Sequence, residues 1–160
     1  MAGQSGNVEA FGDAEYRMGA RQRLDEAFDL LHSEHFAGSI YLAGRSVEGM
    51  LRAVVWKTDS DIRLGKKSLQ TGHDLRELLT MVRRLGLLQA GGRDDEFERT
   101  VQLVARLWFN NMGFASSRFV ERRLRRLGEV DRKRTIKQTS ARFYEACVTI
   151  VKRCETLWQR

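Results

Sequence analysis

Arginine and lysine are concentrated in one short segment, residues 117–137. This segment carries nine basic and three acidic side chains, so it holds six of the seven excess positive charges of the chain. Arginine predominates, and its planar guanidinium group suits the oxygen atoms of a phosphate. Such a density predicts salt-dependent affinity for a nucleic-acid backbone, with little dependence on base sequence. The candidate nucleic-acid-binding residues are Arg118, Arg122, Arg123, Arg125, Arg126, Arg132, Lys133, Arg134 and Lys137.

Two other interpretations of this basic segment stay open. An acidic partner protein would be served equally well by the same charges. The segment could also be a solvated helix face without a specific ligand. Nine basic residues opposed by only Glu121, Glu129 and Asp131 are, however, more than solubility requires.

A second set of polar residues lies within the stretch YLAGRSVEGMLRAVVW, residues 41–56. Its members recur at every third or fourth position and therefore share one helix face: Tyr41, Arg45, Glu48, Arg52 and Trp56. On one interpretation, Glu48 and its arginines line a groove between two copies of the chain. On the other, they form a solvated face whose ion pairs are worth only a few tenths of a kcal/mol.

Histidine and cysteine offer little further chemistry. His73 could act as a ligand or a base, but we expect it to support the start of a helix by hydrogen bonding near Asp74. Cys147 and Cys154 lie seven residues apart in a predicted helix, so their Cα atoms are about 10 Å apart, beyond disulfide reach. No histidine lies close to either cysteine in sequence. We therefore expect two small core residues, and neither a metal site nor a cofactor.

The sequence predicts that helices position the candidate side chains named above. The 160 residues are the usual size of one domain, and the absence of proline permits long helices. Apolar stripes predict an all-α bundle of five or six helices in a domain spanning residues 13–160, after a flexible arm at residues 1–12. The expected helices cover about 13–33, 37–57, 75–85, 94–109 and 136–158, with 58–72 as a loop; residues 118–128 form a short helix or extend the fourth.

Small residues mark one strip of the second predicted helix. Ser46, Gly49 and Ala53 are spaced three and four apart, although each glycine costs a helix up to about 1 kcal/mol. Such a strip predicts the close approach of another helix. No segment reaches the length of a membrane span, and the N-terminus lacks the features of a signal peptide. We expect a cytoplasmic protein that does not bind membranes.

Two segments of the sequence resemble the HEPN family of small prokaryotic helical domains. In residues 27–54, a helix rich in small residues carries Glu48, Leu51 and Arg52 in the family's order. GHDLRELL, residues 72–79, is similar to the His-Asp-Leu start of the family's third helix. The resemblance covers about residues 13–158. It implies an up-and-down helical bundle, a homodimer, and a nucleotidyltransferase or another defence-system protein as a possible partner.

Many HEPN proteins are ribonucleases whose active site contains an arginine followed after four to six residues by a histidine. None of the three histidines here, His32, His35 and His73, is preceded by arginine at that spacing. The motif is absent, so we expect a non-catalytic, dimeric module that binds RNA or a partner in toxin–antitoxin or antiviral defence.

Two alternatives to this function remain. One is a structural subunit that docks on an acidic partner. The other is a metal-independent ribonuclease with non-standard residues that would stabilise charge rather than transfer protons. Asn110 and Asn111 could hydrogen-bond RNA or merely end a helix. The ribonuclease candidates are Glu48, Arg106, Asn110, Asn111 and Arg118.

Overall fold

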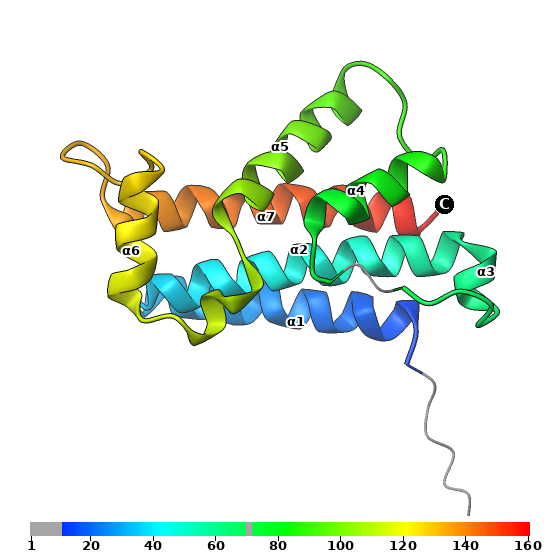
Figure 1. Ribbon diagram of the computed structural model, residues 1–160, viewed down its shortest axis with the longest axis horizontal. Helices are drawn as coiled ribbons and strands as arrows, with labels where there is room; N and C mark the ends of the chain where they lie inside the picture. Colours follow the sequence, from blue (N-terminus) through cyan, green and yellow to red (C-terminus); the bar gives the residue numbers. More distant parts are fainter. Residues whose placement is uncertain (1–10, 70–71) are drawn as a thin grey trace, which may run out of the picture.

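The computed structural model describes residues 11–69 and 72–160, and these residues form seven α-helices, one 3-10 helix and no strand (Figure 1). The all-α helical bundle is confirmed, with two more short helices than the minimum expected. The predicted arm falls almost wholly outside the described residues. In chain order the elements are α1 (Asp13–His32), α2 (Phe36–Thr58), α3 (Ser60–Arg63), α4 (Leu75–Arg84), α5 (Arg93–Leu107), the 3-10 helix η1 (Asn110–Phe114), α6 (Ser117–Arg126) and α7 (Ile136–Trp158).

The three longest helices form the body of the molecule. Figure 1 shows α1, α2 and α7 side by side with α2 between the other two, while α6 crosses one end. Helix α2 is surrounded, so its apolar side chains are the centre of the core; Met50, Leu51 and Val54 are fully buried. Among the described residues, no helix is both long and apolar enough to cross a membrane.

Glycine permits two close contacts along α2. A Cβ atom added at Gly49 would lie 3.2 Å from the Cβ of Ala20, so α1 packs directly on this position, as the strip of small residues predicts. A side chain at Gly44 would overlap the indole ring of Trp108. The Trp108 Nε1 donates a hydrogen bond to the Tyr41 carbonyl oxygen, 3.1 Å away, which fixes the end of α5 against α2.

Capping side chains explain where several helices begin. Asp74 caps α4 by accepting from the backbone nitrogens of Arg76 at 2.8 Å and Glu77 at 3.3 Å. The expectation of a plain loop over residues 58–72 is wrong in part, because Asp59 caps the short helix α3. Ser116 caps α6 through the Phe119 nitrogen, so α6 is a separate helix rather than an extension of α5.

Two further expectations about apolar residues had different outcomes. Cys147 and Cys154 are buried and free, and burial raises the pKa of both thiols. The apolar spacing of Leu24, Ala27, Phe28 and Leu31 predicts one core stripe on the first helix, yet Phe28 is 45% exposed. Its ring lies at the edge of the α1–α7 contact, 5.9 Å from the ring of Tyr144, because the neighbouring Ala27 takes the buried position.

Candidate functional site

The basic segment occupies one end of the bundle, where α6 and the loop to α7 lie (Figure 1). The structure divides its nine cationic side chains into two groups. Four have partners: Arg125 pairs with Glu121, Arg134 with Glu129, Lys137 with Glu34, and Arg123 lies 4.6 Å over the ring of Phe109. The other five are exposed and form no ion pair within the described residues: Arg118, Arg122, Arg126, Arg132 and Lys133.

Three of these unpaired arginines form a single row. Arg118, Arg122 and Arg126 are four residues apart on α6, so they lie on one helix face with about 6 Å of rise between neighbours. We call them the arginine row. The opposite side of α6 carries Val120 and Leu124, which are buried against the bundle. Helix α6 is therefore amphipathic: one face is buried against the bundle, and the charged side chains of the other face are mainly positive.

Glu129 fastens this end of the molecule to the bundle. Its carboxylate pairs with both Arg106 of α5 and Arg134, and its carbonyl oxygen accepts from the Thr139 hydroxyl of α7. Arg106, a ribonuclease candidate, is thus held in a structural ion pair. In the same loop, Asp131 accepts from the backbone nitrogens of Lys133 and Arg134, and these hydrogen bonds lower the pKa of its carboxyl.

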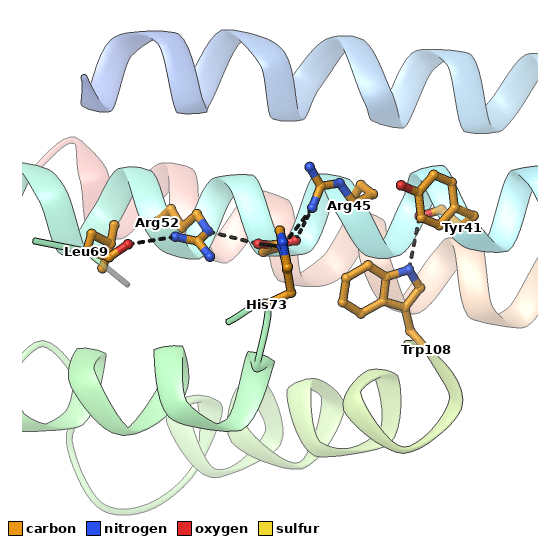
Figure 2. Close-up of polar contacts among 7 residues, drawn as sticks. Tyr41, Arg45, Arg52, Leu69, His73 and Trp108 are labelled. Atoms are coloured by element: carbon orange, nitrogen blue, oxygen red, sulfur yellow. Dashed lines mark hydrogen bonds and ion pairs between the residues drawn. The ribbon is translucent and has the colours of Figure 1, made fainter. Parts of the chain in front are cut away.

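A second polar site surrounds Glu48 on α2. The Glu48 carboxylate accepts from Arg45 Nη1 at 2.6 Å and from Arg52 Nε at 2.9 Å, and it lies 2.7 Å from Nδ1 of His73 (Figure 2). Glu48 is only 2% exposed. The interpretation of this stripe as a solvated face is therefore wrong for Glu48, because a buried carboxylate needs partners that compensate its lost hydration.

His73 reaches this site from the segment that precedes α4. Its backbone has a φ of 67°, in the left-handed region that residues other than glycine rarely adopt. The expected hydrogen bonding near Asp74 is wrong, since the imidazole extends toward α2 and contacts Glu48 and Arg45. Arg52 Nη1 also donates to the Leu69 carbonyl oxygen at 3.1 Å (Figure 2). Together these contacts tie the chain ahead of α4 to the centre of α2.

The hydrogen bond from His73 to Glu48 gives the imidazole a defined orientation. Two groups contact the same Nδ1 and ask for opposite tautomers: a carboxylate can only accept, whereas Arg45 Nη1, 3.0 Å away, can only donate. The contact with Glu48 is the shorter of the two, at 2.7 Å, and favours the tautomer whose Nδ1 carries a proton and donates it. In the neutral ring, Nε2 then keeps a lone pair and can accept a proton from another molecule. This arrangement of a carboxylate behind a histidine is the one that orients a general base.

His73 borders two hollows of the surface. The first, of about 450 Å³, is lined by residues that include Tyr16, Arg45 and Glu48. The second, of about 320 Å³, is lined on its other side by Asn110 and Arg123. The Nε atom of Arg123 is buried and has no hydrogen-bond partner within the described residues. One residue of the basic segment therefore shares a hollow with the histidine.

The five ribonuclease candidates are not brought together as a set. Glu48 lies at the first hollow, Asn110 lines the second, and Arg106 pairs with Glu129. Arg118 is exposed on α6, and Asn111 is exposed in η1. Asn110 and Asn111 do not end a helix, since α5 stops at Leu107 and they begin η1.

Sequence reasoning missed the contact between Glu48 and His73. A signal was present, because Glu48 is directly preceded by the core residue Val47 and followed by the small residue Gly49. A lone carboxylate on such a face implies buried partners from another segment. Within residues 11–69 and 72–160, no group of three or more His, Cys, Asp or Glu side chains is arranged to hold a metal ion.

Comparisons with protein-family models, with curated proteins and with solved structures gave no match. The resemblance to the HEPN family therefore rests on the sequence segments around Glu48 and His73.

Proposed function

We propose that the protein binds the phosphate backbone of RNA or another nucleic acid through the basic end of the bundle. One observation carries the proposal: Arg118, Arg122 and Arg126 form an exposed row without an ion pair among the described residues. Each guanidinium group that neutralises a phosphate releases a condensed counterion, which favours binding at low salt. Arg132 and Lys133, in the loop beyond α6, are two further exposed cations of the basic segment.

The distribution of ion pairs supports this proposal over a solvated face. The carboxylates of the segment are already engaged: Glu121 with Arg125, Glu129 with Arg106 and Arg134, and Asp131 with backbone nitrogens. The arginine row therefore keeps its full positive charge for an external anion. An acidic protein would also satisfy that charge, and the experiment below separates the two kinds of partner.

Fluorescence anisotropy with a labelled RNA pool tests the proposal. The variant R118Q/R122Q/R126Q removes the row, and R84Q/R93Q/R99Q removes three exposed arginines of α4 and α5 as a control of equal net charge. For a single strand, loss of three phosphate contacts reduces the slope of log affinity against log salt by about 2. We expect this reduction for the first variant and little change for the control.

The opposite outcomes have clear meanings. Equal losses in both triple variants would show that net charge, not the arginine row, attracts RNA. Absence of binding by the unmodified protein at low salt would contradict the proposal. In that case, a pull-down with an acidic protein partner that depends on Arg118, Arg122 and Arg126 would favour the structural-subunit alternative.

The histidine site favours a second candidate function, metal-independent cleavage of RNA. His73 Nδ1 lies 2.7 Å from the buried Glu48 carboxylate, which leaves Nε2 able to remove the proton of a 2′-hydroxyl. Arg45 at the first hollow, or Arg123 at the second, would stabilise the charge that develops on the phosphorus oxygens. Of this set, Glu48, His73 and Arg45 are in mutual contact, whereas the other candidates Arg106, Asn111 and Arg118 form no hydrogen bond or ion pair with Glu48 within the described residues.

Incubation of RNA with the protein and its H73N variant tests cleavage. We expect products from the unmodified protein and none from H73N, with binding and circular dichroism spectra preserved. If H73N cleaves at the same rate, His73 is not the base. If neither protein cleaves RNA that is bound, the module is non-catalytic, which was the function expected from the missing motif.

The resemblance to HEPN domains supports two further proposals. We infer a homodimer, which sedimentation equilibrium of the purified chain tests directly. A place in toxin–antitoxin or antiviral defence, with a nucleotidyltransferase or another defence protein as partner, is tested by expressing the chain alone and measuring growth. Monomers at all concentrations would contradict the first, and unchanged growth with and without phage would contradict the second.

A further inference from the structure

Phe114 is the most exposed of the large apolar residues described. Its side chain ends η1 and is 90% exposed, although burial of a phenylalanine side chain stabilises a fold by about 2 kcal/mol. Nothing among the described residues stacks on its ring. A single exposed apolar residue is ordinary on a protein surface, but this one lies three residues before the basic helix α6, which makes it a candidate for contact with a ligand of that helix.

The turn that presents Phe114 is firmly held. Met112, two residues earlier, is 2% exposed and anchors η1 in the core. The Ala115 nitrogen donates to the Met112 carbonyl oxygen at 3.1 Å, which closes the turn around Phe114. A Cβ atom at Gly113 would lie only 2.7 Å from the ring of Tyr41, so the backbone there packs directly on α2. The ring of Phe114 is therefore displayed from a fixed support.

Aromatic and guanidinium groups also lie in the segments that flank η1. Phe119 of α6 is 42% exposed and meets Phe109 edge-on at 6.4 Å, and Arg123 covers another part of the Phe109 ring. The arginine row begins at Arg118, only four residues after Phe114. Four residues of chain span at most about 14 Å, so the Cα atoms of Phe114 and Arg118 are no farther apart than a few nucleotides of an extended strand.

We propose that the basic end binds single-stranded rather than duplex nucleic acid, with one base stacked on Phe114 while the phosphates follow the arginine row. This inference rests on the proposed function and specifies its ligand. Aromatic rings beside a basic groove are the means by which proteins hold single strands, because every base has a face that can stack. In a duplex, both faces of an internal base are already covered by its neighbours.

The dimensions of the site agree with a short single strand. Arg118, Arg122 and Arg126 extend over about 12 Å along α6, with about 6 Å between successive side chains. Together with Phe114, they offer one stacking position and three phosphate positions. This corresponds to about four nucleotides, the lower end of the range for small single-strand-binding sites.

Anisotropy titrations with a single-stranded oligonucleotide and the matching duplex test the inference. The variant F114A removes the ring and F114Y keeps an aromatic face. L64A removes another exposed apolar side chain, which directly follows α3; this helix lies at the opposite end of the bundle from α6 (Figure 1). We expect F114A to weaken single-strand binding by about 5- to 100-fold, the usual effect of losing one stacked base. Duplex binding by F114A, and all binding by F114Y and L64A, should stay within about twofold.

Each other outcome overturns the inference. Equal weakening of single-strand and duplex binding by F114A, or no weakening, would exclude selective stacking while leaving phosphate binding intact. Tighter binding of duplex than of single strand by the unmodified protein would also overturn it. If F114A instead changes the sedimentation of the free protein, Phe114 belongs to a contact between copies. In these titrations, the proposed function itself fails if the unmodified protein binds neither oligonucleotide, so the two failures are distinguishable.

Discussion

Helices α2 and α6 each carry charged residues at intervals of three or four, yet the two rows have opposite physical characters. On α2, Arg45 and Arg52 flank the buried Glu48 carboxylate, which also contacts His73. On α6, Arg118, Arg122 and Arg126 face water without an ion pair among the described residues. A similar spacing of charged residues thus gives a site of paired charges around Glu48 on α2 and, in the described part of the chain, a row of unpaired charges at the surface of α6. Burial and partner groups decide which of the two a charged stripe becomes.

The largest loss of stability is expected when the carboxylate of Glu48 on α2 is removed. Glu48→Ala leaves Arg45 and the buried Arg52 without their shared carboxylate, so we expect the free energy of unfolding to fall by about 3–5 kcal/mol. Urea denaturation followed by circular dichroism measures this loss. The control Glu121→Ala breaks an exposed ion pair on α6 and should cost no more than about 0.5 kcal/mol. Similar losses in both variants would refute the contrast between the rows.

A buried ion pair outside these two rows should contribute an intermediate amount to the free energy of unfolding. Asp94 accepts from the Gln89 nitrogen at 2.8 Å and pairs with Arg153 of α7, and these contacts lower the pKa of its carboxyl. We expect Asp94→Asn to reduce the free energy of unfolding by about 2 kcal/mol at pH 7.

The effect of Asp94 should also depend on pH in a defined direction. Because its folded pKa lies below the unfolded value, its contribution is complete above about pH 5 and is lost as the pH falls through the folded pKa. Denaturation of the unmodified protein and of Asp94→Asn at several pH values tests this. A difference between them that grows on acidification would contradict the assignment.

The smallest expected effect on stability belongs to the arginine row. The variant R118Q/R122Q/R126Q removes three like charges from an exposed face, so stability should change by no more than about 0.5 kcal/mol and should rise, if anything, at low salt. Melting in low and high salt measures this change. A large loss of stability would mean that the row supports the fold, which would weaken its assignment to a ligand.

Features set by neighbouring residues could be predicted from the sequence. The cap at Asp74 depends on side-chain and backbone groups within three residues, and the close approach of α1 at Gly49 follows from the size of residues on one helix face. The basic segment was equally visible, since charge can be counted without a fold. Its division into cationic residues with and without partners was only partly visible, because Lys137 and Arg123 find their partners, Glu34 and Phe109, outside the segment.

The candidate catalytic site was hidden for the same physical reason. Glu48 and His73 are 25 residues apart, and their contact depends on the path of the chain between α3 and α4. Periodicity assigns Glu48 to a helix face but cannot identify what covers that face. Likewise, the apolar stripe of α1 gave no means to distinguish the exposed Phe28 from the buried Ala27, because the positions of α2 and α7 decide which residue is covered.

The shared carboxylate of Glu129 has a mechanical consequence. A strand pulled along α6 would apply tension to the loop that joins α6 to α7. The Glu129 carboxylate connects that loop to α5 through Arg106 and to a later residue of the same loop, Arg134. The Thr139 hydroxyl connects the loop to α7 by donating to the Glu129 carbonyl oxygen. Force on the basic end is therefore distributed into two helices of the bundle, so α6 can resist displacement as part of a rigid body rather than swing on its loop.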